Sequence, residues 1–291
     1  MEMGGGLVQL AVQSNAVEFQ NVGTEIVELP VIENPNNFTI HLVRAGDFVS
    51  KMFIECSMEM FKSLESIEFI IDGQSIIKYD STWWYTEHLV LTNVMLFPLL
   101  FFEKTLFPVL LFSPHHTPPY VKVNLNENKA EGGIKFFASY TYVDNEERGS
   151  ILKKYSEYKL PIHQVQRLTV PAKNTSVSID LTRFDHVVKK LAWNTLPGFE
   201  RACITLNGKM LVPWIHRSFF QKIQGKYSYS FMPNPEEAWS SRNRGYMDFS
   251  RLNQATLEMT FDNADETREV SVFAINHNVL VFKNGLCALE Y

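Results

Sequence analysis

Apolar and polar residues alternate along much of the chain with the two-residue period of β-strands that bury one face. Such runs occupy residues 38–43, 48–60, 121–125 and 134–143, and they are rich in Val, Ile and aromatic side chains. Helical spacing fits at least as well only at residues 83–91, where we expect a short amphipathic helix. The pattern therefore predicts a protein built mainly from antiparallel β-sheet.

Turn residues divide these runs into predicted hairpins. Asp72 and Gly73 separate two apolar runs, and Asp-Gly is a pair that two-residue hairpin turns prefer. A second turn, at residues 44–47, joins the runs on either side of it. Near the C-terminus, a polar loop at 262–267 separates the strand-like runs 256–261 and 269–282. We predict a further hairpin there.

The most apolar stretch, residues 89–112, approaches the roughly 20 residues that a membrane-spanning helix needs. It is interrupted by Pro98 and Pro108, and by the charged pair Glu103 and Lys104 near its middle. Each charge at the centre of a bilayer costs about 2.5 kcal/mol or more. We therefore expect a buried or interface segment rather than a span.

The second half of the chain repeats the first, with each match about 135 residues after its partner. Order and spacing are both retained, as an internal duplication requires. The matched segments are 38–42 with 176–181, 47–55 with 185–193, 68–77 with 202–212, 121–125 with 257–261, and 136–142 with 270–276. A chance alternation explains any one match but not five in register.

Duplication of a β pattern predicts an all-β fold of two tandem jelly-roll sandwiches, each with about eight strands, and short helices in the loops. We place an N-terminal arm at residues 1–30, the first jelly roll at 31–155 and the second at 156–291, joined around residues 153–170. Each jelly roll hides its edges by packing two sheets face to face.

Composition narrows the chemistry. The 291 residues hold 27 Lys and Arg against 32 Asp and Glu, and the formal net charge of −5 gives no general attraction to nucleic acid. Three cysteines lie far apart and predict buried, reduced thiols rather than a disulfide framework. His115 and His116 lack a third ligand at a recognisable spacing, so we expect no metal and no cofactor.

Several short strings along both halves of the chain are distinctive in combination. In the first half they are Gly4-Gly-Gly-Leu-Val-Gln-Leu, Arg44-Ala-Gly-Asp47, Ile71-Asp-Gly-Gln74 with Trp83, and Asp144-Asn-Glu-Glu-Arg148. In the second half they are Phe184-Asp-His-Val-Val-Lys-Lys-Leu-Ala-Trp193, Leu206-Asn-Gly208, Phe249-Ser-Arg251 and Ala274-Ile-Asn276. These strings resemble the double jelly-roll major capsid proteins of nucleocytoplasmic large DNA viruses. Together they span nearly the whole chain, and the combination is specific although each string alone is weak.

This resemblance implies a structural protein of the virion, made in the host cytoplasm. Its copies would form homotrimeric, pseudo-hexagonal capsomers that tile an icosahedral capsid. The implied partners are the chain itself, neighbouring capsomers, minor capsid proteins and an internal membrane, with no sequence-specific contact to nucleic acid. Val187 stands where the family has proline, and Asp248 where it has asparagine. Family members are considerably longer, mainly in outer loops of the second jelly roll, so we expect reduced surface decoration.

Candidate subunit contacts are the aromatic residues that the pattern leaves near loops, because aromatic side chains carry much of the energy of protein interfaces. They are Trp83, Trp84, Tyr85 and Trp239, and a core position is the alternative for each. Arg251 is a further candidate contact. Pairing with a nearby acid such as Asp248 or Glu237 explains Arg251 without a partner subunit, and we favour that structural role.

Two alternatives from other classes remain open. A minor capsid or scaffolding paralogue would share the fold, whereas a carbohydrate-binding β-sandwich would run as a monomer or dimer. A hydrolytic enzyme is disfavoured because neighbouring side chains on a strand point apart, which makes Glu146 and Glu147 a poor acid and nucleophile pair. No sequence motif of a serine hydrolase, P-loop, zinc protease or dinucleotide-binding enzyme is present.

Overall fold

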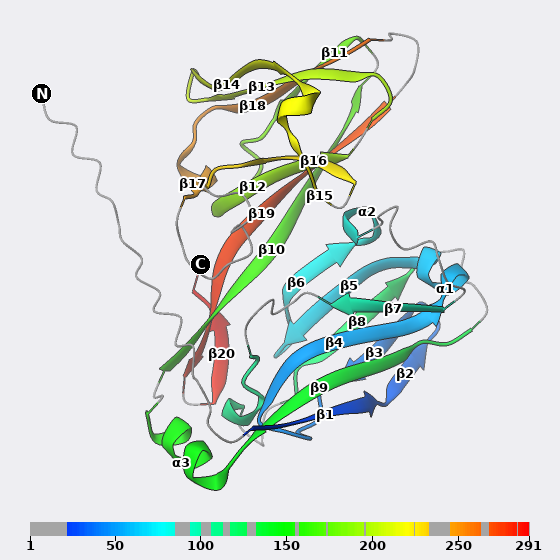
Figure 1. The fold of residues 1–291 in the computed structure, drawn as a ribbon, viewed down its shortest axis with the longest axis vertical. Coiled ribbons are helices and arrows are strands. Elements are labelled where there is room, and N and C mark those ends of the chain that lie inside the picture. Colours follow the sequence, from blue (N-terminus) through cyan, green and yellow to red (C-terminus); the bar gives the residue numbers. More distant parts are fainter. Residues whose placement is uncertain are drawn as a thin grey trace, which may run out of the picture.

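Two β-sandwiches lie one above the other, and two long strands run from the second along one side of the first (Figure 1). The computed structural model describes residues 22–84, 94–99, 106–112, 117–126, 132–154, 157–172, 174–194, 196–223, 225–232, 245–262, 268–283 and 285–290. Each sandwich is made of two antiparallel sheets that face each other across a hydrophobic core.

The first sandwich has a four-stranded sheet in the order β1-β9-β4-β7 and a five-stranded sheet in the order β2-β3-β8-β5-β6. The first sheet comprises β1 (Val22–Leu29), β9 (Lys135–Val143), β4 (Phe48–Ser57) and β7 (Val94–Leu99). The second comprises β2 (Val31–Asn34), β3 (Asn37–His41), β8 (Tyr120–Leu125), β5 (Leu64–Ile71) and β6 (Gln74–Asp80). Short helices lie between strands: α1 (Met58–Lys62), α2 (Ser81–Trp84), η2 (Val109–Leu111) and α3 (Asn145–Lys154).

The second sandwich repeats this plan. One sheet runs β10-β19-β12-β16-β15, with β17 beside β12 and β20 beside β19, and the other runs β11-β18-β13-β14. The first of these comprises β10 (Glu157–Ala172), β19 (Arg268–Lys283), β12 (Val187–Asn194), β16 (Lys226–Ser230), β15 (Gln221–Ile223), β17 (Met247–Asp248) and β20 (Leu286–Leu289). The second comprises β11 (Ser176–Asp180), β18 (Ala255–Phe261), β13 (Phe199–Leu206) and β14 (Lys209–His216). Two 3₁₀ turns, η3 (Arg217–Phe219) and η5 (Phe249–Arg251), complete it.

The internal duplication is visible strand for strand. The order β1-β9-β4-β7 in the first sandwich corresponds to β10-β19-β12-β16 in the second, and β3-β8-β5-β6 corresponds to β11-β18-β13-β14. Every segment pair that the sequence comparison matched falls on equivalent strands of these two sets. Two sheets of four equivalent strands in this order make a jelly roll, so the predicted double jelly roll is confirmed.

Two of the three predicted hairpins are wrong. β18 pairs with β11 and β13, whereas β19 pairs with β10, β12 and β20, so these successive strands lie in different sheets. β3 and β4 are likewise in different sheets. Alternation shows which side chains face the core, but in a jelly roll both sheets face the same core, so it cannot assign a strand to its sheet.

The Asp-Gly hairpin is confirmed. β5 and β6 are paired neighbours, joined by Asp72 and Gly73 with positive φ angles of 48° and 79°. Two consecutive residues in this left-handed region make the turn whose twist matches the flanking strands. Asn207 and Gly208 take the same positions between β13 and β14, with φ of 47° and 74°.

Both sandwiches begin with a strand that the sequence analysis did not foresee. Residues 22–29, expected to be the last part of an arm, form β1 and pair with β9 along their whole length. Residues 157–172, part of the expected linker, form β10. Both strands lie at a sheet edge and expose many side chains, so their alternation is weak. Residues 1–21 lie outside the described residues.

The apolar stretch 89–112 contributes β7 and η2 to the first sandwich, in agreement with a buried or interface segment. None of the helices in the described part of the chain is long and apolar enough to span a membrane. The string Asp144-Asn-Glu-Glu-Arg148 lies at the beginning of α3, where the Asp144 side chain accepts a hydrogen bond from the backbone N–H of Glu147 at 2.8 Å. Cys56 and Cys203 are buried free thiols, as predicted, whereas the free thiol of Cys287 is only partly buried.

The core of the first sandwich extends into residues of β10 and β19. Leu160 and Ile162 from β10, and Leu280 and Phe282 from β19, are buried in the same cluster as the first sandwich's own strands. The other ends of the two long strands, including Ala172, Val270 and Val272, belong to the core of the second sandwich. The boundary between the two units is therefore not a single point in the sequence.

We expect Phe282→Ala to lower the free energy of unfolding by about 3–5 kcal/mol, because it removes a buried ring and leaves a cavity. The Phe282 ring lies 5.8 Å from that of Phe107 and 5.4 Å from that of Phe112, both in the first sandwich. Urea denaturation followed by tryptophan fluorescence measures the change. Leu286→Ala on the exposed part of β20 is the control, with an expected effect of about 0.5 kcal/mol or less. The shared core would be contradicted if the protein unfolded in two separate transitions and Phe282→Ala shifted the midpoint of only one of them.

Candidate functional site at the junction of the two jelly rolls

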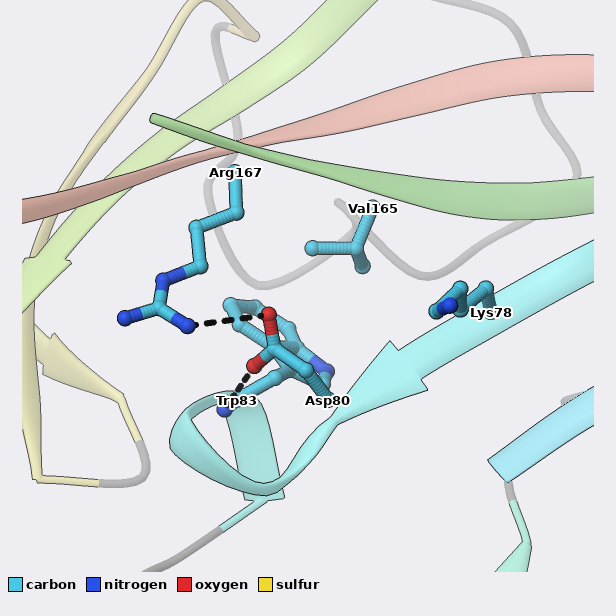
Figure 2. Close-up of a pocket in the computed structure, with 5 residues that line it drawn as sticks. All are labelled: Lys78, Asp80, Trp83, Val165 and Arg167. Carbon is cyan, nitrogen blue, oxygen red and sulfur yellow. Dashed lines mark hydrogen bonds and ion pairs between the residues drawn. The ribbon is translucent and has the colours of Figure 1, made fainter. Parts of the chain in front are cut away.

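The two sandwiches meet where β6 and α2 of the first face β10 of the second, and a pocket of about 180 Å³ remains there. Figure 2 shows its lining residues, Lys78, Asp80, Trp83, Val165 and Arg167. The Asp80 carboxylate accepts a hydrogen bond from the backbone N–H of Trp83 at 3.1 Å and pairs with the Arg167 guanidinium at 3.4 Å. One carboxylate thus orders α2 and links it to β10.

Trp83 is buried at this junction within a single chain. Its side chain is only 7% exposed, and its ring centroid lies 5.2 Å from that of Phe273 in β19. The Lys226 ammonium from β16 lies 5.6 Å from the centre of the Trp83 ring and donates a hydrogen bond to the Trp83 carbonyl at 2.9 Å. A desolvated cation over an aromatic face adds to the apolar contact, so Trp83 anchors one sandwich to the other.

A second polar bridge crosses the junction through Gln164 of β10. Its amide donates a hydrogen bond to the Ile76 carbonyl in β6 at 2.6 Å, and its side-chain oxygen accepts one from the Asn278 amide at 2.9 Å. An amide that is bonded at both ends has few free orientations. The bridge therefore fixes the position of β10 against the first sandwich.

Three lysines of the second sandwich, Lys189, Lys190 and Lys226, are almost fully buried. Burial penalises the charged form and lowers the pKa of each lysine to about 8. Asp80 partly opposes this shift in the pKa of Lys226. The Lys190 ammonium has no hydrogen-bond partner within the described part of the chain. A lysine pair inside an apolar strand was visible in the sequence, but lysines are usually expected at the surface, so this burial was missed.

Two histidines lie beside Lys189, directly opposite each other on β10 and β19. The ring centroids of His163 and His277 are 6.2 Å apart, and the Lys189 ammonium lies 3.3 Å from Nε2 of His163. Burial, reinforced by the charge of Lys189, lowers the pKa of His163 well below 6.5 and that of His277 to about 3. Both rings are therefore neutral at neutral pH.

The structure does not gather the predicted contact residues into one site. Trp83 and Trp84 end α2, whereas Arg251 ends η5 in the second sandwich. The Arg251 side chain is 78% exposed and pairs with Asp248 at 2.9 Å, as expected for the structural role. Tyr85 and Trp239 lie outside the described residues. The helix at 83–91 that the sequence predicted is described only as far as residue 84.

No cluster of three or more His, Cys, Asp or Glu able to hold a metal ion is present among the residues that the structure describes. His115 and His116 lie outside them. Glu146 and Glu147 occupy the first turn of α3 rather than a strand. The polar groups that the described part of the junction brings together are lysines, histidines, amides and the Asp80–Arg167 ion pair, and several of them bond one sandwich to the other.

Known capsid proteins share both sequence and fold with this chain. It is 40% identical over 67 residues to the major capsid protein of Phaeocystis pouchetii virus, covering 22% of this chain and 12% of the relative. It is 25% identical over 199 residues to the major capsid protein of Pyramimonas orientalis virus, covering 53% and 48%. The chain thus matches less than half the length of these curated relatives. No protein-family profile matches it.

Among solved structures, the capsid protein VP54 of PBCV-1 superposes with a TM-score of 0.78 at 18% identity, and the alignment covers 94% of this chain and 98% of that one. The identity is low, so this match establishes the fold, while the sequence relatives are themselves major capsid proteins. The chain has the double jelly-roll fold and is similar in sequence to the major capsid proteins of these two viruses. The relatives and this structural neighbour are capsid proteins, not enzymes.

In this double jelly-roll chain, two of the strings that carried the resemblance meet in space. Asp47, from the turn before β4, accepts hydrogen bonds from Arg148 at 2.8 Å and 2.9 Å, and from the backbone N–H of Val143 at 2.9 Å. The hydrogen bond to Asp47 raises the pKa of Arg148. Both oxygens of the buried Asp47 carboxylate are used, so the two strings form a structural clamp that closes one end of the first jelly roll.

We expect Asp47→Ala in the double jelly-roll chain to lower the free energy of unfolding by about 2 kcal/mol, because it leaves a buried N–H and a guanidinium without their acceptor. Thermal denaturation followed by circular dichroism measures the loss. Lys135→Ala, which removes the exposed 3.7 Å pair with Glu55, is the matched control and should cost about 0.5 kcal/mol or less. Equal effects of the two substitutions would contradict the clamp.

The histidine pair predicts a loss of stability in acid. Because the pKa of His277 is depressed in the fold, the unfolded chain takes up the proton first as pH falls below 6.5. This contribution to stability is complete above pH 6.5 and declines down to about pH 3, by at most about 1.4 kcal/mol per pH unit for one group. Urea unfolding at a series of pH values measures the decline, which should be shallower in His277→Gln. Parallel profiles for the two proteins would count against the assignment.

Proposed function

We propose that this chain is a structural capsid protein whose copies form homotrimeric, pseudo-hexagonal capsomers of an icosahedral shell. The internal duplication is the main support. Two jelly rolls with the same strand order give each copy two similar units, so a threefold ring of copies presents six similar units around its axis. Such a ring has nearly hexagonal symmetry, and hexagonal units tile a surface without gaps.

The junction supports this proposal because a tile must keep its shape. Trp83, Lys226 and Gln164 connect the sandwiches, and β10 and β19 contribute to both cores. Inter-domain contacts of ordinary proteins are small and allow relative motion. Strands shared between two cores resist such motion, so both units of one copy would enter the ring in a fixed relative orientation.

For subunit contacts, Trp84, Tyr85, Trp239 and Arg251 remain our proposed residues. Trp83 is occupied within its own chain and would act by positioning α2. Arg251 keeps 78% of its side chain exposed beside Asp248 and is accessible to a neighbour. Neighbouring capsomers, minor capsid proteins and an internal membrane are the proposed further partners, and the virion, with assembly in the host cytoplasm, is the proposed location.

Size-exclusion chromatography with light scattering tests the proposal. At micromolar concentration we expect a particle of three times the 33.6 kDa mass of one chain. A monomer under these conditions contradicts a capsomer and returns a carbohydrate-binding sandwich to consideration. Mass spectrometry of purified particles then separates the two capsid roles, because a scaffolding paralogue assembles but is absent from mature particles.

A further inference from the structure

Strand β14 and the following η3 turn present an unusual apolar edge on the second sandwich. β14 is the last strand of its sheet, so its outer side has no neighbouring strand among the described residues. Four large apolar side chains are exposed along it: Met210 at 52%, Leu211 at 38%, Trp214 at 40% and Phe219 at 52%. Exposed apolar side chains gathered in one place mark a contact surface more often than scattered ones. We call residues 209–222 the basic edge.

The charges of the basic edge have one sign. Lys209, Arg217 and Lys222 are exposed within it, and residues 207–223 contain neither Asp nor Glu. Pro213 stands in the middle of β14 and has no N–H to offer another strand. The edge is therefore blocked for simple extension of the sheet, and its exposed side chains are what remains to recognise a partner.

The first sandwich has an edge of opposite charge. β1 and β2 are the outer strands of its two sheets and follow each other around Pro30, so together they form one side of the sandwich. Ile26 is 67% exposed and Ile32 is 50% exposed. Three exposed glutamates, Glu25, Glu28 and Glu33, accompany them, and residues 22–43 contain neither Lys nor Arg. We call residues 24–33 the acidic edge.

The two edges cannot meet within one chain. Figure 1 shows β14 near one end of the molecule's longest axis and β1 near the other end. The acidic edge therefore lies at one end of the molecule and the basic edge at the other. These oppositely charged edges can contact each other only between different copies. A contact that joins two different patches repeats from copy to copy, and it forms a ring when the rotation closes.

We propose that the basic edge of one copy packs against the acidic edge of the next, so that the second jelly roll of each chain contacts the first jelly roll of its neighbour. Trp214 is the aromatic anchor, and Ile26, which lies on the same outer face of β1 as Glu28, is its apolar counterpart. The exposed glutamates and lysines of the two edges set the orientation. This contact rests on the proposed function, since a capsomer requires copies that meet, and it names the surfaces by which they do.

Charge reversal with restoration tests the contact in the full-length chain. One variant carries Glu28→Lys and Glu33→Lys, a second carries Lys209→Glu and Lys222→Glu, and a third carries all four substitutions. Each of the first two places like charges across the contact and should weaken the trimer by at least about tenfold in dissociation constant. The third restores opposite charges and should recover the trimer. Light scattering over a dilution series measures all three.

Two controls separate the contact from folding and from net charge. Glu65→Lys changes an exposed glutamate on β5, away from both edges, and should leave the dissociation constant unchanged. Circular dichroism spectra should match wild type for every variant. Trp214→Ser and Ile26→Ser probe the apolar part without new charge, so the test stands even if a charge-reversed chain fails to fold. Each should also weaken association at least about tenfold.

The outcomes distinguish this contact from the proposed function. A monomeric wild type overturns both. If the wild type is a trimer and neither the charge reversals nor the serine substitutions weaken it, the edge contact alone is overturned. The edge contact is likewise overturned if these edges bind lipid vesicles or a minor capsid protein while the trimer is unchanged. Dimers or open chains that respond to the reversals, and recover in the fourfold variant, would support the edge contact while rejecting the trimeric capsomer.

Discussion

The antiparallel pairing of β10 with β19 is the interaction on which the rest of the structure depends. It runs without interruption from the pair Glu157 and Lys283 to the pair Ala172 and Arg268. One end of this ribbon closes the second jelly roll, and the other end packs into the core of the first. Because the same backbone ladder serves both cores, separating the sandwiches would expose apolar surface on each of them.

The ribbon also explains why polar groups are buried at the junction. Its middle passes between two cores, where His163 and His277 face each other beside Lys189, and Lys190 and Lys226 lie on the neighbouring strands β12 and β16. Burying these groups opposes folding, as their lowered pKa values indicate. The apolar clusters on both sides outweigh this cost. Protonation of the buried histidines would place further charge in this region, so the junction is sensitive to acid.

The strings shared with capsid proteins act mainly on the fold of each copy. Asp47 and Arg148 close the first jelly roll, Asn207 and Gly208 make a hairpin turn, and Asp248 accepts a hydrogen bond from the Ser250 N–H in η5 and pairs with Arg251. The surfaces with features of a contact, on β14 and on β1 with β2, lie in other segments. Family resemblance therefore marks how a copy is built more than how copies meet.

Sequence alone determined many of the strands, the duplication and the Asp72-Gly73 hairpin, because two-residue alternation and left-handed turn residues are local properties. It also predicted that Arg251 pairs with a nearby acid, and the structure shows that this acid is Asp248, three residues away. Only the tertiary structure decided that β18 and β19 belong to different sheets, that β1 and β10 are strands, and that Trp83 joins the sandwiches. Sheet partners, and the burial of Lys189, Lys190 and His277, depend on contacts between residues far apart in the chain, which local patterns do not encode.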